Sequence, residues 1–218
     1  MRRSRTEAAA GAGALALMIA ACGATPATPA VPSCPTDRTV VVASQAQVVA
    51  LARCATLRGL TIRTGGALDT SVLHALATIT GDLVIGPTVG VESITLGELR
   101  AVGGTLRVVG NGLMQGLFLP RLERSGPIEI DGNVAITTVS LPSLTAVRGA
   151  VRITDNASLE LVDMPMLVAI DQELVLTGAP QLTLVEAAQL HAAAAVRIDA
   201  PKLPADVADQ LRAIAAAR

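Results

Sequence analysis

The sequence contains no tryptophan and no tyrosine, and its single aromatic residue is Phe118. A core must therefore be built from aliphatic side chains, which dominate the apolar fraction of 51%. The same shortage removes the stacking surfaces on which single-stranded nucleic acids and sugar rings are bound. The 17 basic and 18 acidic residues nearly cancel, and no basic run follows the N-terminus. We therefore expect no nucleic-acid partner.

The N-terminus has the features of an export signal. Three arginines within the first five residues precede an apolar stretch over residues 8–21, which is shorter than the roughly 20 residues that span a bilayer. The stretch ends in IAAC at residues 19–22, which resembles the bacterial lipobox. In that motif the cysteine is acylated and becomes the new N-terminus. We therefore expect a lipoprotein signal peptide over residues 1–21 and lipidation of Cys22, the alternative being an ordinary secretory signal with an unrelated cysteine.

Residues 22–35 are rich in proline, alanine and threonine. Such a composition predicts an extended tether between the lipidated cysteine and the folded part of the chain. Two or three acyl chains on one residue give stable membrane attachment. Among bacterial lipoproteins, a residue other than Asp after the cysteine, here Gly23, implies sorting to the outer membrane where a cell has one. We expect an exported chain, anchored by lipid to the bacterial cell envelope.

Two further cysteines remain, Cys34 and Cys54. In an exported protein they are expected to form a disulfide bond. A metal site is the weaker alternative, because no histidine or third cysteine accompanies the two thiols. We expect neither a metal nor another cofactor.

An internal repeat of 22 or 23 residues determines the expected fold. Its register is marked by seven positions: Arg58, Gly81, Gly104, Gly126, Gly149, Gln172 and Ala194. A short segment with two apolar residues in alternation follows each mark, which is typical of a half-buried strand. The pairs are Leu60/Ile62, Leu83/Ile85, Leu106/Val108, Ile128/Ile130, Val151/Ile153, Leu174/Leu176 and Val196/Ile198.

A second short strand follows in each complete unit, as in Leu117/Leu119 and Val139/Leu141, and a single leucine comes after it. A proline stands just past the second strand at Pro120, Pro142 and Pro165. Between the two strands an asparagine recurs at Asn111, Asn133 and Asn156. Equivalent residues of successive coils stack, so these asparagines are expected to form a structural row that satisfies backbone groups at a bend.

The pattern predicts an all-β chain, a right-handed β-helix or solenoid of about seven coils over residues 36–203. Ser44 opens a capping box for a short N-terminal helix that is expected to run to about Cys54. An Ala-rich amphipathic segment over residues 204–218 is expected to form a C-terminal capping helix.

These features together resemble the receptor L-domain, a module related to leucine-rich repeats that occurs in growth-factor-receptor ectodomains. The resemblance rests on the two cysteines around the capping helix, on RGLTI at residues 58–62 and on recurring L-x-I-x-x-N and L-P-x-L units. Residues 149–167 form the clearest unit. The resemblance implies a right-handed β-helix over roughly residues 34–203 with a recognition role outside the cytoplasm. The receptors' ligand contacts form no motif that can be carried over to this chain.

Two functions are compatible with this fold, a non-catalytic binding or scaffold module and a carbohydrate-active enzyme of the envelope. Hydrolases need clustered carboxylates. The candidate acids are spread singly along the coils: Glu129, Asp131, Asp155, Glu160 and Asp163. We therefore expect a binding module and not an enzyme.

The expected binding surface is the outer face of the strands. The residue between each apolar pair points outward, which places Arg107, Glu129 and Arg152 side by side, with Glu129 between two arginines. In the second strands the outward row contains Phe118, and aromatic residues often anchor interfaces. We expect an envelope or cell-surface protein to dock around Phe118 or this charged run.

Overall fold

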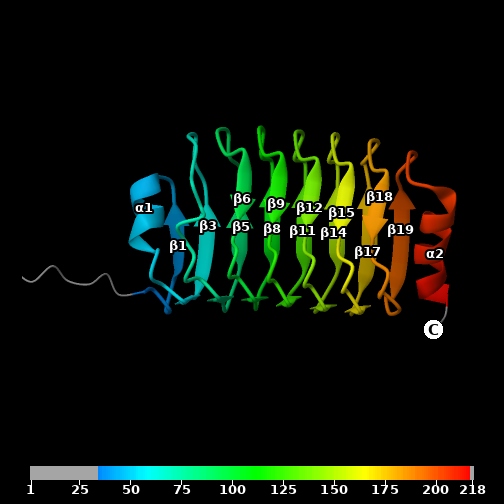
Figure 1. Cartoon of the computed structure of the whole chain (residues 1–218), viewed down its shortest axis with the longest axis horizontal. Coiled ribbons are helices and arrows are strands. Elements are labelled where there is room, and N and C mark those ends of the chain that lie inside the picture. The colour runs from blue at the N-terminus through cyan, green and yellow to red at the C-terminus, as the bar shows by residue number, and fades with distance from the viewer. Residues whose placement is uncertain (1–33, 217–218) are drawn as a thin grey trace, which may run out of the picture. The chain divides into compact units, whose positions relative to one another are not determined.

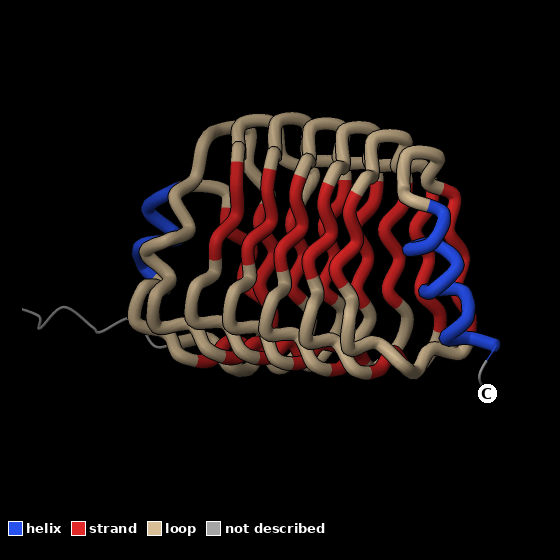
Figure 2. Tube along the Cα trace, turned by 45° about the vertical axis from the view of Figure 1, so that its right-hand side comes forward, coloured by secondary structure: helices blue, strands red, loops and turns tan. Residues whose placement is uncertain are grey.

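The computed structural model describes residues 34–216, which form a β-solenoid of about seven coils with a helix at each end (Figure 1). The expected all-β solenoid is thereby confirmed. The coils lie side by side, and every pair of neighbouring strands is parallel. Figure 2 shows the strands of successive coils aligned in separate layers.

Three parallel sheets run along the solenoid. Sheet A contains β1 (Thr39–Val42), β3 (Gly59–Ile62), β5 (Leu83–Ile85), β8 (Leu106–Val109), β11 (Ile128–Asp131), β14 (Val151–Thr154), β17 (Glu173–Thr177) and β19 (Ala195–Asp199). Sheet B contains β2 (Thr56–Leu57), β4 (Thr78–Ile79), β7 (Ala101–Val102), β10 (Arg124–Ser125), β13 (Ala146–Val147) and β16 (Ala169–Ile170). Sheet C contains β6 (Ser93–Thr95), β9 (Gly116–Phe118), β12 (Thr138–Ser140), β15 (Leu161–Asp163) and β18 (Leu184–Glu186).

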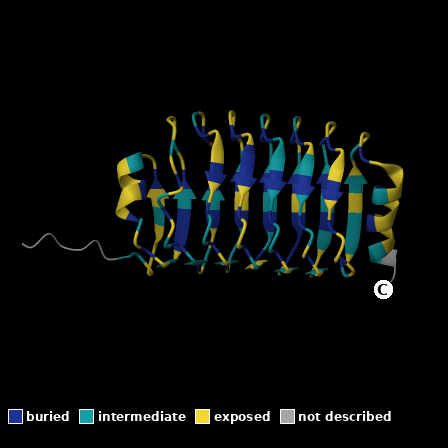
Figure 3. Ribbon diagram, in the orientation of Figure 1, coloured by how far each residue is buried: buried dark blue, intermediate teal, exposed yellow. Residues whose placement is uncertain are grey.

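The apolar pairs that define the repeat point into the solenoid. Leu106, Ile128 and Val151 are fully buried and lie opposite one another on adjacent strands. Alternating buried and exposed positions are visible along the strands in Figure 3. Because a strand exposes successive side chains on opposite faces, each coil contributes its apolar residues to one continuous aliphatic core.

Sheet B was not predicted from the sequence. The two-strand unit expected from the sequence is incomplete, since a third strand of two residues follows the buried leucine in most coils. Such a strand directs only one side chain inward, for example Val102 or Val147. One inward residue gives no alternation, and the periodic pattern therefore carried no signal for it.

The asparagine row forms a buried ladder across the coils. The backbone N–H and Nδ2 of Asn111 donate to Oδ1 of Asn133 at 3.1 and 2.8 Å, and the same groups of Asn133 donate to Oδ1 of Asn156 at 3.0 and 3.1 Å. Thr88 adds the first rung by donating to Oδ1 of Asn111 at 2.7 Å. Since all four side chains are buried, the ladder supplies the bends with the hydrogen bonds that buried backbone requires.

Both ends of the solenoid carry helices. At the N-terminal end, α1 (Gln45–Ala50) begins with the expected capping box of Ser44 and Gln47, but it ends four residues before Cys54. Cys54 forms a disulfide with Cys34 across a Cα–Cα distance of 5.4 Å, as expected. At the C-terminal end, α2 (Ala205–Ala216) buries Ala208 and Leu211 against the last coil.

Candidate functional site

The outward row of sheet A has the register that the sequence predicted. Arg107 lies opposite Glu129, and Glu129 lies opposite Arg152, on three adjacent strands. Val84 precedes this run, and Val175 follows it. The charged residues therefore share one solvent-exposed face in the centre of the sheet.

The ion pairs within this face differ from the expected arrangement. Arg107 Nη1 lies 3.1 Å from Glu129 Oε2. Arg152 instead donates to Oε1 of Glu173, from Nε at 3.1 Å and from Nη2 at 2.5 Å. Arg197 Nη2 lies 3.8 Å from the other oxygen of Glu173. Glu173 was not among the residues predicted for this face, although it stands two residues before Val175 and so faces the same side.

Glu173 is electrostatically distinct on this face. The hydrogen bond from Arg152 is the main reason that the pKa of its carboxyl lies below the ordinary value of 4.5. Arg107 pairs with Glu129 and Arg152 pairs with Glu173, so each arginine has a carboxylate partner within the protein. A charged surface whose charges are already paired offers less to a partner than one whose charges are unpaired.

The outward row of sheet C is different in character. Phe118 lies between Thr95 and Ser140 in register, and 37% of its surface is exposed. A Cβ atom on Gly116 would lie 2.3 Å from Cε2 of Phe118, so the ring extends across Gly116 and along the strand. The lack of a side chain at Gly116 thus creates the seat for the only aromatic ring in the chain.

The other members of this row are small or acidic. Ser140 donates a hydrogen bond of 2.8 Å to Oδ2 of Asp163, and Glu186 follows in the next coil. Phe118 is consequently the only apolar side chain in a row whose other members are polar or acidic. Aromatic residues are enriched among the side chains that contribute most to interfaces, and polar residues are typical of the rim around them.

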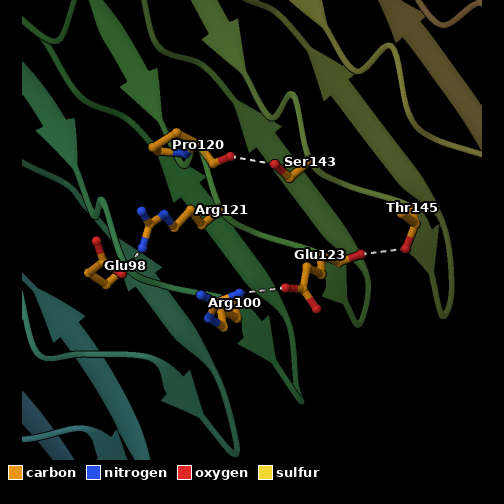
Figure 4. Close-up of polar contacts among 7 residues, drawn as sticks. All are labelled: Glu98, Arg100, Pro120, Arg121, Glu123, Ser143 and Thr145. Atoms are coloured by element: carbon orange, nitrogen blue, oxygen red, sulfur yellow. Dashed lines mark hydrogen bonds and ion pairs between the residues drawn. The ribbon is translucent and has the colours of Figure 1, made fainter.

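The turn between sheets C and B carries a polar network of its own (Figure 4). Arg121 forms an ion pair with Glu98, and Arg100 Nη1 lies 2.8 Å from Glu123 Oε1. One coil further, Ser143 donates to the backbone oxygen of Pro120 at 2.6 Å. The two members of each pair are 23 positions apart, so these contacts join equivalent places on adjacent coils.

The acids considered for catalysis do not form a cluster. Asp131 accepts a hydrogen bond from Thr154, and Asp163 accepts one from Ser140. Asp155 has a positive φ of 53° and forms part of the bend beside the asparagine ladder. Glu129 is paired with Arg107. Within residues 34–216 no group of three or more His, Cys, Asp or Glu residues has a geometry that could hold a metal ion.

The hollows on the described surface include the following two. One of about 270 Å³ lies between β18 and α2. The other, of about 230 Å³, lies on sheet B and is lined by Gly103, Arg124, Gly126 and Arg148 among others. Both volumes fall below the roughly 300–1,000 Å³ typical of small-molecule sites.

The expected signal peptide, lipidated Cys22 and most of the tether lie outside the described residues. None of the helices in the described part combines the length and apolar character needed to cross a membrane. Comparison with protein-family models, with curated proteins and with solved structures gave no match.

Proposed function

We propose that this chain is an exported, lipid-anchored binding module of the bacterial cell envelope, and that its protein partner docks on sheet C around Phe118. The observation that carries the proposal is the partly exposed ring seated on Gly116 within a flat polar row. Sheet A is the less favoured docking surface, because Arg107 and Arg152 already pair with carboxylates of the chain itself.

Three features support the exported part of the proposal. The IAAC sequence at residues 19–22 resembles a lipobox and follows an apolar stretch. The Cys34–Cys54 disulfide suits an oxidising compartment. The resemblance of the sequence to the receptor L-domain implies recognition outside the cytoplasm.

The anchor is tested by replacing Cys22 with Ala and fractionating cells. The parent chain should stay in the membrane fraction after a carbonate wash, and the Cys22→Ala chain should be released. Retention of the variant in that fraction would contradict a lipid anchor on Cys22.

The docking surface is tested by capturing partners from the native envelope with the lipid-free Cys22→Ala chain. Phe118→Ser should abolish or strongly reduce capture of the partner that the parent chain retains. Val134→Ser is the matched control, since Val134 is also apolar and is 57% exposed but lies on a loop. Arg152→Glu should have the smaller effect. Equal capture by the Phe118→Ser and parent chains would rule out docking around Phe118.

A further inference from the structure

The sheet C strands are linked by a regular series of backbone hydrogen bonds. The N–H of Leu119 donates to the oxygen of Ser140 in the next coil at 3.1 Å, and Leu141 donates in the same way to Asp163 at 2.8 Å. Met164 then donates to Glu186 at 2.8 Å. Each inward residue at this position thus directs its N–H toward the following coil, as a parallel ladder requires.

Ala187 is the next member of this series. No strand of sheet C follows β18, and no described residue accepts a hydrogen bond from the N–H of Ala187. By the alternation of a parallel strand, Val185 directs its own N–H and C=O to the same open edge. Only 8% of Ala187 and 6% of Val185 is exposed, so these backbone groups lie in a sheltered place where a missing partner is costly.

At other sheet edges, groups of the chain itself contact the terminal strand. On β6, at the opposite edge of sheet C, the hydroxyl of Thr70 donates to the oxygen of Thr95 at 3.1 Å and accepts from its N–H at 3.2 Å. At the C-terminal end of sheet A, Arg212 of α2 donates to the oxygen of Ile198 at 3.2 Å. At the same end of sheet B, Ala192 forms a β-bridge with Ala169. Among the described residues, none provides the N–H of Ala187 on the edge of β18 with such a hydrogen-bond partner.

The hollow of about 270 Å³ lies directly beside this edge. Val185 and Ala187 line it on the strand side, and Val207, Gln210 and Leu211 line it on the side of α2. A hollow of this size suits the small side chains of an added strand better than it suits an organic ligand.

The charges beside this edge favour a basic residue in any strand that pairs with it. Asp163 and Glu186 lie opposite each other in register, and no described basic residue forms an ion pair with Glu186. Like charges on neighbouring strands are unfavourable, and a basic residue beside them is favourable. The molecule already uses such cross-coil pairs elsewhere, as between Arg121 and Glu98.

We propose that β18 accepts an extended segment of a partner protein as an additional parallel strand of sheet C. The segment places small apolar side chains in the hollow and an arginine or lysine beside Glu186, while its backbone pairs with Val185 and Ala187. This surface is separate from the Phe118 face, so the inference extends the proposed binding function and can fail independently of it.

The first measurement is amide hydrogen exchange of the Cys22→Ala chain by nuclear magnetic resonance. In the free protein the amide of Ala187 should exchange at least about tenfold faster than those of Met164 and Leu141, which occupy the same position in preceding coils. Equal protection at the three positions would show that the edge is closed and would overturn the proposal.

The second measurement uses the peptide acetyl-LTLVRAAQ-amide, which copies residues 182–189 with arginine in place of Glu186. Its addition should slow the exchange of Ala187 at least about tenfold, whereas acetyl-LTLVEAAQ-amide should have little effect. In the Glu186→Arg protein this preference should reverse, because Glu186 is exposed and its replacement leaves the core unchanged. An unchanged preference, or no response to either peptide, would contradict strand addition. The Phe118→Ser protein should respond like the parent chain, which separates this surface from the Phe118 face.

Discussion

The two sides of the sheet C strands differ in how strictly they repeat. On the inner side, Ile94, Leu117, Val139 and Val162 are all aliphatic and fully buried. On the outer side, the corresponding row reads Thr95, Phe118, Ser140 and Asp163. Inner positions must fit the same neighbours in every coil, whereas outer positions face solvent and are free to vary. The comparison indicates that repetition specifies the solenoid, and that departures from repetition on the outside are where a binding surface should be sought.

The largest loss of stability is expected from removal of the Cys34–Cys54 disulfide. Replacing Cys34 and Cys54 with Ala removes a cross-link between residues 20 positions apart, which should lower the free energy of unfolding by about 3 kcal/mol. Chemical denaturation of the variant and parent chains measures the difference. An unchanged midpoint would show that the N-terminal cap is held by packing alone.

The asparagine ladder should show the next largest effect. Asn133→Ala removes buried hydrogen bonds to both neighbouring rungs and should cost about 2–3 kcal/mol. Ser143→Ala is the matched control, because Ser143 also bonds to the preceding coil but is on the outside. It should cost less than about 1 kcal/mol. Similar costs for the two variants would remove the distinction between inner and outer rows.

Ser125 is an exception within an inner row and sharpens the comparison. It occupies the inward position of β10 between Val102 and Val147, and its buried hydroxyl has no hydrogen-bond partner among the described residues. Ser125→Val should therefore raise the free energy of unfolding by about 1 kcal/mol, as should Ser125→Ala to a smaller extent. A loss of stability in both variants would show that the hydroxyl is needed.

The smallest effect is expected on the charged outer face of sheet A. Since the pKa of Glu173 is lower in the folded chain than in the unfolded chain, its ionised form contributes stability above its ordinary pKa. This contribution is lost as the pH falls through the lower folded value. Glu173→Gln should thus be slightly less stable than the parent chain near pH 7, and the difference should shrink toward pH 3. Denaturation at both values provides the test, and a difference that persists at low pH would contradict the role of the carboxylate.

The sequence predicted the features that a pattern of residue types marks. It marked the alternating pairs and the asparagine row by their spacing and the disulfide by the two remaining cysteines, and the structure has each of them. It gave no sign of sheet B, although the strands of that sheet also recur in most coils. It did not reveal Thr88 as the first rung, because a threonine interrupts an asparagine pattern. It also did not reveal that Arg152 pairs with Glu173. Strand register places Arg152 beside Glu129, but the conformation of the arginine side chain brings its guanidinium group to Glu173. The seat of Phe118 on Gly116 depends on a ring conformation that no periodicity encodes.

The central claim is that the position of the Phe118 ring, and not the solenoid alone, determines binding, and Gly116→Ala tests it most directly. This change retains Phe118 but places a methyl group where its ring now lies. With the captured partner, affinity should fall at least about tenfold, which corresponds to about 1.4 kcal/mol, while the melting temperature does not fall. Unchanged affinity with a displaced ring would contradict the account, as would a fall in melting temperature of several degrees.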